Sequence, residues 1–421
     1  MNFLIIDICY TGNTLGVASQ MIKNYCVSIG CGIALTEADA DYVLISIVHP
    51  QLAYKFKKFT KPIIAGGPGA LSPSSIGVYA NFVVLGDFRK AIYTLHNFGE
   101  KAFCDLNNIW INKDSRQVSI DNSFPFEMQG YVSDNGTKQV FVSRGCKRKC
   151  AFCQTGWGTI YQECKVDIVI KNIGGKFNFV SNAISDVSYY DQLKKYPGAA
   201  SHTFDSVSKN IPGDTCIRIG VEGVSERLRK AIMKPIKNED LINTTVNLIN
   251  MGKTVRWFMI AGLPFENECD WEEFKSIVAP IAYLRKAGNF QISFTAYVPE
   301  PATPISDLKY SNEYYSLYKD FADWFFACIR RGWIRILKCQ FPENRNEKAL
   351  WQMGIECKND RVLYPYRNLI KKYQEHYIKS IGAHVVCAEP PAENQGAEPV
   401  HLTTAVLREG RSAHIAEVAT S

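Results

Sequence analysis

Three closely spaced cysteines are the residues of this chain whose type and spacing most directly indicate chemistry. Cys146, Cys150 and Cys153 stand in the run SRGCKRKCAFC, with the pattern C-x₃-C-x₂-C. A [4Fe–4S] cluster usually takes four cysteine thiolates, and this run supplies three with no obvious fourth close by. One iron would then keep an open position. The spacing therefore predicts a cluster that can bind a further ligand.

Zinc is the main alternative for such a group of thiolates. A structural zinc site closes four ligands around one ion and usually shows two paired C-x₂-C or Cys/His motifs. The next cysteines, Cys164, Cys216 and Cys269, each stand alone in the sequence. Spacing alone therefore favours the cluster over zinc, and it leaves an unspecialised iron–sulfur site or a chance pattern as further alternatives.

Composition limits the class of protein. With 421 residues, 46% of them hydrophobic and 21% charged, the chain has room for two or three globular domains. Its start, MNFLIID, lacks the basic segment and cleavage site of a signal peptide. The 14 cysteines are therefore interpreted as reduced thiols of a cytoplasmic protein. No apolar run approaches the roughly 18 residues that span a bilayer, so no membrane contact is expected.

The charge balance is mildly basic. The net charge is +7, with a local cluster at Lys55, Lys57, Lys58 and Lys61. Such an excess is compatible with a phosphate-bearing or nucleic-acid substrate, but scattered lysines on a solvated surface explain it equally well.

Residues 1–100 alternate short apolar runs with turn signals, as a small parallel α/β unit does. We expect a helix over Val17–Ser28 and strands over Phe3–Ile8, Tyr42–Ile47, Pro62–Ala65 and Phe82–Leu85. The last two strands end in Gly-Gly-Pro and Gly-Asp, which is typical of strand ends above a ligand crevice. The pattern predicts a doubly wound, Rossmann-like domain.

The remaining chain is predicted to be a barrel with flanking segments. Residues 101–138 form a connector with a hairpin of Ile109–Asn112 and Val118–Ile120, and residues 139–308 alternate strands with helices. The alternation predicts an α/β fold with a partial (β/α)₆ barrel. A helical C-terminal region follows over 309–381. Residues 382–421 change abruptly in composition and read as a flexible tail that need not be native to the protein. The expected barrel strands are Gln139–Val142, Phe177–Val180, Thr215–Ile219, Val255–Ile260 and Phe290–Ala296.

The cysteine motif and the ordered strand motifs of residues 139–305 resemble the radical SAM superfamily. The resemblance implies that Cys146, Cys150 and Cys153 bind three irons of a [4Fe–4S] cluster. S-adenosylmethionine (SAM) would bind the fourth iron through its amino and carboxylate groups. Phe152, just before the third cysteine, would pack near the adenine, although a core aromatic is the alternative.

The resemblance also implies SAM contacts from the later strands. Glu222 and Arg227 lie in a segment like the family's fourth strand, where polar side chains meet the SAM ribose and carboxylate. A glutamate inside the apolar run Ile219–Val224 is costly unless it has a partner. Arg227, or Arg229 in its place, could pair with the carboxylate as a bidentate fork. The segment Met259–Pro264 matches the fifth strand, so that the adenine would be lined by Ile260, Gly262 and Leu263.

The second strand departs from the common pattern. The family often has a Gly-Gly-Glu run here that holds the SAM amine, and this chain has Ser181-Asn182-Ala183-Ile184-Ser185. Ser181 or Ser185 would then replace the glutamate.

The N-terminal domain points to one branch of the superfamily. Its strand-GGP-strand-GD succession resembles the cobalamin-binding-type domain that precedes the barrel in that branch. The D-x-H-x-x-G loop, whose histidine binds cobalt, is missing, which leaves cobalamin binding open. The run Thr11-Gly12-Asn13-Thr14 also resembles a flavodoxin phosphate loop, but a simple turn is favoured.

The resemblance implies an enzyme that cleaves SAM reductively to a 5′-deoxyadenosyl radical, with electrons from an external flavodoxin- or ferredoxin-type donor. With cobalamin the reaction would be C-methylation. Without it, a radical rearrangement or the modification of a nucleobase or peptide is the alternative, as is a non-catalytic iron–sulfur protein. The substrate stays open between a small molecule, a peptide and a nucleic acid. No second cysteine triplet is present, which disfavours methylthiolation.

Overall fold

The structure is a computed structural model of the whole chain. It describes residues 1–8, 16–112, 116–123, 131–132, 136–196, 201–282, 284, 290–308, 314–330, 337–340, 362–363, 367–381, 404–408 and 412–416. The chain divides into two compact units. Unit 1 holds residues 1–182, 299–307 and 350–372, and unit 2 holds residues 183–298, 308–349 and 373–421. The domain boundaries expected from the sequence stay a prediction.

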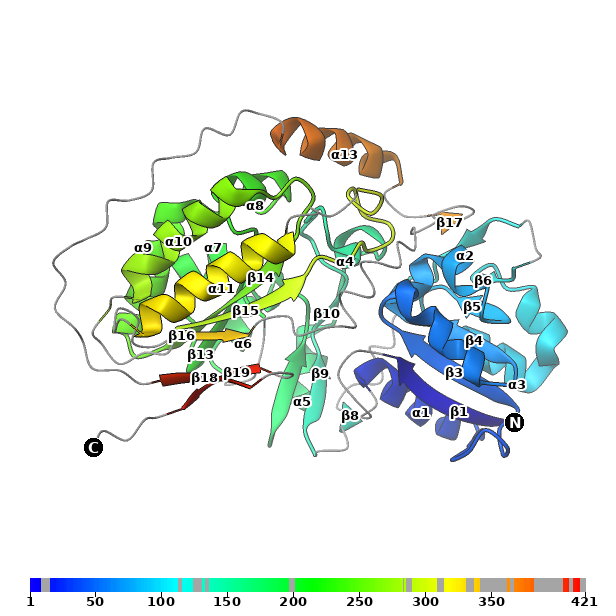
Figure 1. Cartoon of the computed structure of the whole chain (residues 1–421). Helices are drawn as coiled ribbons and strands as arrows, with labels where there is room; N and C mark the ends of the chain where they lie inside the picture. Colours follow the sequence, from blue (N-terminus) through cyan, green and yellow to red (C-terminus); the bar gives the residue numbers. More distant parts are fainter. Residues whose placement is uncertain are drawn as a thin grey trace, which may run out of the picture. The chain divides into compact units, whose positions relative to one another are not determined.

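Unit 1 begins with a six-stranded sheet in the order β2-β1-β3-β4-β5-β6 (Figure 1). The first five strands are parallel, and α1 (Val17–Ser28) and α3 (Arg89–Cys104) accompany them. Two apolar clusters lie in this part of the unit, one around Ile45 and Val83 and the other around Leu44 and Ile64. The predicted doubly wound unit is therefore confirmed. The strands are β1 (Asn2–Ile8), β2 (Gly32–Ile33), β3 (Tyr42–Ile47), β4 (Ile63–Gly66), β5 (Phe82–Val84) and β6 (Ile109–Trp110).

The hairpin predicted for the connector is wrong. Ile109–Trp110 forms β6, which pairs antiparallel with β5, whereas β7 (Val118–Ser119) pairs with β17 (Val362–Leu363). Trp110 is 1% exposed and lies against Gly77, where an added Cβ would come within 1.8 Å of the indole ring. Burial of this large ring in the core of the sheet favours pairing of β6 with β5 over the local hairpin that the sequence predicted.

A second group of strands in unit 1 leads to the cysteines. β9 (Lys138–Phe141) pairs parallel with β12 (Phe177–Val180) and antiparallel with β8 (Tyr131–Val132). The chain then forms β10 (Ser143–Arg144), which pairs with β11 (Gln162–Glu163). The cysteine loop lies between β10 and β11, and α4 (Gln154–Trp157) follows the third cysteine. The next helix is α5 (Val166–Asn172).

Unit 2 contains a parallel four-stranded sheet in the order β13-β14-β15-β16. Its strands are β13 (Cys216–Glu222), β14 (Thr254–Ala261), β15 (Phe290–Ala296) and β16 (Leu337–Gln340). Helices gather around this sheet in Figure 1. They are α6 (Tyr190–Leu193), α7 (Phe204–Lys209), α8 (Glu226–Ala231), α9 (Asn238–Asn250), α10 (Glu268–Ala282) and α11 (Tyr314–Arg330).

One face of this sheet forms the core of unit 2. Trp257 on β14 is fully buried, lies 4.7 Å from the Phe290 ring and 6.4 Å from that of Phe274 on α10, and donates to Thr245 on α9 at 3.1 Å. Alternate residues point to opposite faces of a strand. The residues between the buried ones therefore lie on the other face, which carries polar side chains.

The C-terminal part contains α13 (Arg367–Ile381), and its described tail residues form the antiparallel pair β18 (Thr404–Arg408) and β19 (Ser412–Ala416). None of the described helices is long and apolar enough to cross a bilayer. Among the described cysteines, Cys269 on α10 forms a disulfide, which differs from the expectation that every cysteine stays reduced.

Candidate functional site

The cysteine loop of unit 1 is held by hydrogen bonds within the loop and from Trp157. Cys146, Cys150 and Cys153 are half-buried and form no disulfide. The amide of Arg148 donates to Cys146 Sγ at 3.4 Å, and Trp157 Nε1 donates to the carbonyl of Cys150 at 2.9 Å. One of these bonds involves the sulfur of Cys146, and the other joins the Trp157 ring to the backbone of the loop.

Gly145 allows the loop to leave β10 at this angle. Its φ is 71°, and an added Cβ would lie 2.9 Å from the carbonyl oxygen of Ile160. Both the left-handed backbone and the close approach require glycine. The first cysteine therefore directly follows a position where only glycine fits.

Cys146, Cys150 and Cys153 do not form a group of side chains gathered around one ion in this structure. Within the described ranges, no three His, Cys, Asp or Glu side chains gather closely enough to hold one metal ion. Structural zinc needs four ligands around one ion, whereas cluster thiolates bind separate irons. Burial raises the pKa of Cys153 to about 12, and Glu300 and Cys150 add to the effect. Because ligand thiols must be deprotonated, cluster binding would release protons here.

Glu300 is a residue of this loop that the sequence interpretation missed. Its Oε2 accepts a hydrogen bond from the amide of Gln154 at 2.8 Å, immediately after the third cysteine. Burial raises the pKa of Glu300 to about 7, against the effect of this hydrogen bond. Its position within the run Val298-Pro299-Glu300-Pro301 was the available signal, since prolines on both sides hold it in a rigid turn.

The second-strand residues divide between the two units. In unit 1, Ser181 Oγ lies 2.7 Å from Ser143 Oγ, and Asn182 Nδ2 donates to the carbonyl of Gly145 at 3.1 Å. Ser181 thus lies beside the start of the cysteine loop. In unit 2, Ser185 Oγ is 3.0 Å from Thr203 Oγ1 and accepts from the Thr203 amide. Phe152 is half-buried within the loop.

Glu222 ends β13 and has a partner within the protein. Its Oε1 lies 3.0 Å from Lys234 Nζ, and its φ of 71° accompanies a register shift between Gly220 and Glu222. An added Cβ on Gly220 would lie 2.3 Å from Glu222 Oε1 and 2.7 Å from Lys234 Nζ. The missing side chain of Gly220 therefore makes room for this ion pair.

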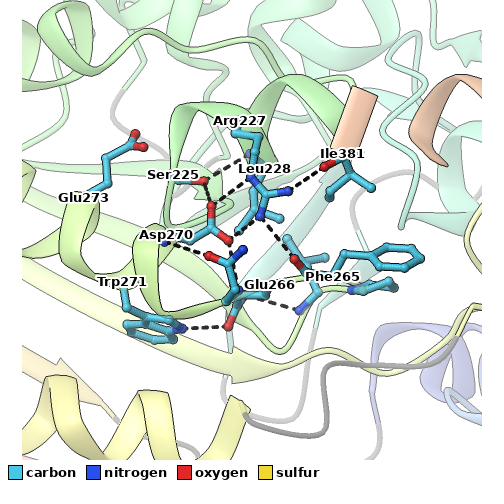
Figure 2. Close-up of polar contacts among 12 residues, drawn as sticks. Ser225, Arg227, Leu228, Phe265, Glu266, Asp270, Trp271, Glu273 and Ile381 are labelled. Atoms are coloured by element: carbon cyan, nitrogen blue, oxygen red, sulfur yellow. Dashed lines mark hydrogen bonds and ion pairs between the residues drawn. The ribbon is translucent and has the colours of Figure 1, made fainter. Parts of the chain in front are cut away.

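Arg227 is committed to a polar network within unit 2, which Figure 2 shows. Its Nη2 and Nε contact the two carboxylate oxygens of Asp270 at 2.5 and 3.2 Å. Its remaining contacts are the carbonyls of Phe265 at 3.1 Å and Ile381 at 3.0 Å. A role in binding the SAM carboxylate would require Arg227 to give up part of this network.

Asp270 and Arg229 complete the polar interior around α8. Asp270 also accepts from Ser225 Oγ at 2.5 Å and from the Asn267 amide at 3.0 Å. Arg229 is fully buried and donates to the carbonyls of Ile236 at 2.8 Å and Gly223 at 3.1 Å. Both arginines considered as SAM ligands thus hold the protein backbone together.

The segment after β14 is fixed by a buried carboxylate. Glu266 accepts from the amides of Gly262 and Leu263 at 3.0 and 3.3 Å, and from Trp271 Nε1 at 2.9 Å. Tyr377 on α13 donates to the carbonyl of Pro264 at 2.7 Å. Gly262 has a φ of 85°. Ile260 and Leu263 are buried.

Glu266 should make stability depend on pH. Burial raises its pKa to about 8, above the ordinary value near 4.3, so between these values the folded state holds a proton that the unfolded state has lost. Stability therefore falls as pH rises from about 5 to 8, by at most about 1.4 kcal/mol per pH unit from this group. Thermal unfolding over pH 5–8.5 should show a shallower slope for Glu266→Gln than for the native protein. The exposed Glu268→Gln is the control, and equal slopes for all three proteins would contradict the assignment.

Comparisons with known proteins support the fold. No family model matches the chain, and no curated protein matches its sequence significantly. Among solved structures, the radical SAM methyltransferase TsrM from Kitasatospora setae, with cobalamin and a [4Fe–4S] cluster bound, aligns with a TM-score of 0.54 and 12% identity. The alignment covers 73% of this chain and 77% of TsrM. The cobalamin-dependent SAM radical enzyme OxsB, with aqua-cobalamin and SAM bound, aligns with a TM-score of 0.50, 14% identity and coverage of 76% and 56%. The chain therefore has the α/β fold of the cobalamin-dependent radical SAM enzymes, as the sequence motifs predicted.

Proposed function

We propose that this protein is a radical SAM enzyme that binds a [4Fe–4S] cluster through Cys146, Cys150 and Cys153 and cleaves SAM reductively. The observation that carries the proposal is the loop of three cysteines, outside any disulfide, in a chain with this fold. When bound, the cluster and SAM together supply one-electron chemistry that activates a substrate C–H bond. The protein's own residues bind, orient and shield these groups.

Each element of the loop has a distinct task in this proposal. Gly145 sets the direction of the loop, and Trp157 holds the backbone at Cys150. Glu300 holds the amide after Cys153.

Several residues would contact SAM in this proposal. Ser181 is well placed for the SAM amine because it lies beside the cysteine loop. Glu222 keeps its carboxylate oriented through Lys234. We also propose that SAM contacts Phe152, Ser185, Ile260, Gly262 and Leu263. Arg227 acts instead as a positioning residue, since its contacts hold the segment that contains Gly262 and Leu263.

Gly220→Ala tests the proposed role of Glu222. The new methyl group would displace the ends of two flexible side chains, so we expect the free energy of unfolding to fall by less than about 1 kcal/mol. SAM affinity should fall about tenfold, equivalent to about 1.4 kcal/mol. Chemical denaturation and calorimetric SAM binding measure the two effects. Gly174→Ala, where nothing lies within 4 Å of the added Cβ, is the control. Unchanged SAM affinity would remove Glu222 from the site.

Cobalamin-dependent C-methylation is the proposed reaction type, and the likeness of the fold alone carries it. Gly67 and Gly86 follow β4 and β5, but an added Cβ at either would meet backbone, that of Ile47 or of Asp121. Both glycines are therefore explained by close packing of the chain, and they give no evidence for a cofactor. His49, after β3, has a pKa lowered to about 4 by burial, so it is neutral at pH 7. Radical rearrangement or another modification without cobalamin is the alternative.

The function is tested with anaerobically purified, cluster-reconstituted protein, an external one-electron reductant and SAM. Formation of 5′-deoxyadenosine and methionine supports the proposal. A bound cluster without SAM cleavage, with candidate substrates present, would instead favour a non-catalytic iron–sulfur protein. The ion pair between Arg227 and Asp270 favours this non-catalytic alternative, because it occupies an arginine that was expected to bind the SAM carboxylate. An absorption spectrum of the purified protein incubated with cobalamin then separates methylation from cobalamin-independent chemistry.

A further inference from the structure

We propose that Arg218 and Arg256 form an anion-binding site on the polar face of the unit 2 sheet, and that it takes the carboxylate or phosphate group of the substrate. The identification of the ligand as substrate rests on the proposed function. The existence of the anion site rests on the arrangement of the two arginines alone.

The arginines are neighbours by strand register. Arg218 on β13 is the Cα partner of Arg256 on β14, and Arg256 is the partner of Gln291 on β15. Neighbouring strands lie about 4.8 Å apart, and partners in a parallel register point to the same face. The strands β13, β14 and β15 are neighbours in the sheet (Figure 1). Three side chains that carry N–H donors therefore form a row across them.

The row lies on the face opposite the helix-packed core. The residues that alternate with it, Ile217, Ile219, Val255, Trp257 and Ile292, are all buried. Arg218, Arg256 and Gln291 are half-buried. Their guanidinium and amide groups therefore remain reachable by a ligand.

Neither arginine of this row forms an ion pair in the described part of the chain. Arg218 has no hydrogen-bond or ion-pair partner there, and the one polar side-chain contact of Arg256 is the bond from Nε to Gln291 Oε1 at 2.7 Å. The carboxylates nearest along the chain are already paired: Asp214 with His202 at 3.1 Å, and Glu222 with Lys234 at 3.0 Å.

Two adjacent guanidinium groups repel each other, and a bound anion would offset this cost. The Gln291 contact fixes the plane of the Arg256 guanidinium and leaves its terminal nitrogens for a ligand. Guanidinium groups suit carboxylate and phosphate because they present paired donors in a rigid fork. The geometry therefore matches an anionic group held between the two arginines.

The nature of the rest of the ligand is suggested by Phe258, the next residue of β14 on the same face as Arg256. Phe258 lies two residues beyond Arg256, about 7 Å toward the carboxyl end, and is 36% exposed. Its register partner is Gly220, beside the Glu222–Lys234 pair. The ring thus offers an apolar surface between the arginines and Glu222. We infer a small substrate with a flat apolar body and an anionic end.

The test uses the full-length, cluster-reconstituted protein with benzoate and phenyl phosphate as probes and benzyl alcohol as the uncharged comparison. We expect an anionic probe, at about 100 times its dissociation constant, to raise the unfolding midpoint by about 3 °C, and benzyl alcohol to have no effect. The stronger of the two anionic probes identifies the group as carboxylate or phosphate.

Variants connect this binding to the arginines. Arg218→Gln and Arg256→Gln should each weaken probe binding by about 10-fold or more, and Arg218→Lys should weaken it less. Without probe, Arg218→Gln should raise the unfolding midpoint by about 1 °C, since it removes the like-charge contact. Lys237→Gln removes the same charge from an exposed position in unit 2 and should change neither quantity.

Three results would overturn the inference: neither anionic probe binds, Lys237→Gln weakens binding as much as the arginine variants do, or those variants weaken SAM binding as much as probe binding. The last result would assign the site to the SAM carboxylate. SAM cleavage by the native protein is a separate measurement. Cleavage without probe binding contradicts only this inference, whereas arginine-dependent probe binding without SAM cleavage contradicts only the proposed function.

Discussion

Replacing any one of Cys146, Cys150 and Cys153 by alanine should abolish cluster binding and SAM cleavage. Each thiolate would hold a separate iron, and no other cysteine lies in the loop. Changes to groups behind a metal ligand typically cost 10–100-fold, so loss of a ligand itself should reduce 5′-deoxyadenosine formation by more than about 100-fold. Iron and sulfide content, the absorption spectrum and product formation measure the result.

The fold should survive these substitutions, because the side chains of Trp157 and Glu300 hold the backbone of the loop. The Trp157 bond to the carbonyl of Cys150 and the Glu300 bond to the Gln154 amide do not need the sulfurs. Cys104→Ala, on α3, is the matched control and should retain full iron content. A loop variant that keeps its cluster and its activity would show that the cluster has other ligands.

Asp270→Ala should cause the largest loss of stability, about 3–5 kcal/mol in the free energy of unfolding. The side chain of Asp270 is 3% exposed and accepts from Ser225, Arg227 and the Asn267 amide. Removing it leaves the Arg227 charge, 17% exposed, without its carboxylate and two further donors without an acceptor. Urea denaturation of the purified protein measures the loss.

A double-mutant cycle separates the ion pair from the rest of the effect. Asp270→Ala and Arg227→Met should be strongly non-additive, with a coupling of about 2 kcal/mol, because they share one contact. Asp240→Ala, at an exposed position on α9, should cost less than about 0.5 kcal/mol. If the two substitutions were additive, or if Asp270→Ala lowered the free energy of unfolding no more than Asp240→Ala does, the network would contribute little to stability.

This network bonds the backbone of the segment after β14 at several points. Arg227 holds the carbonyl of Phe265, Glu266 holds the amides of Gly262 and Leu263, and Tyr377 holds the carbonyl of Pro264. Phe265 itself has a φ of 65°. A non-glycine residue keeps such a backbone only where its surroundings over-determine it. A rigid segment is what binding of a flat adenine ring would require.

Much of the local structure could be predicted from the sequence. The strand at Tyr42–Ile47 and the helix at Val17–Ser28 have the predicted bounds, because apolar runs between turn residues specify such elements locally. The cysteine spacing similarly determined the candidate cluster site, since its three ligands lie within one short loop. The ordered strand motifs of residues 139–305 indicated the fold that the solved structures share.

The partners of the site residues were decided only by the tertiary structure. Glu222 meets Lys234, Arg227 meets Asp270 and Glu300 meets the Gln154 amide. The sequence showed that a buried glutamate needs a partner, but it could not show which one. The pairing of β6 with β5 and the alignment of Arg218 with Arg256 depend likewise on strand register. Register is set by how buried faces pack against helices and neighbouring strands, and no local run of residues contains that information.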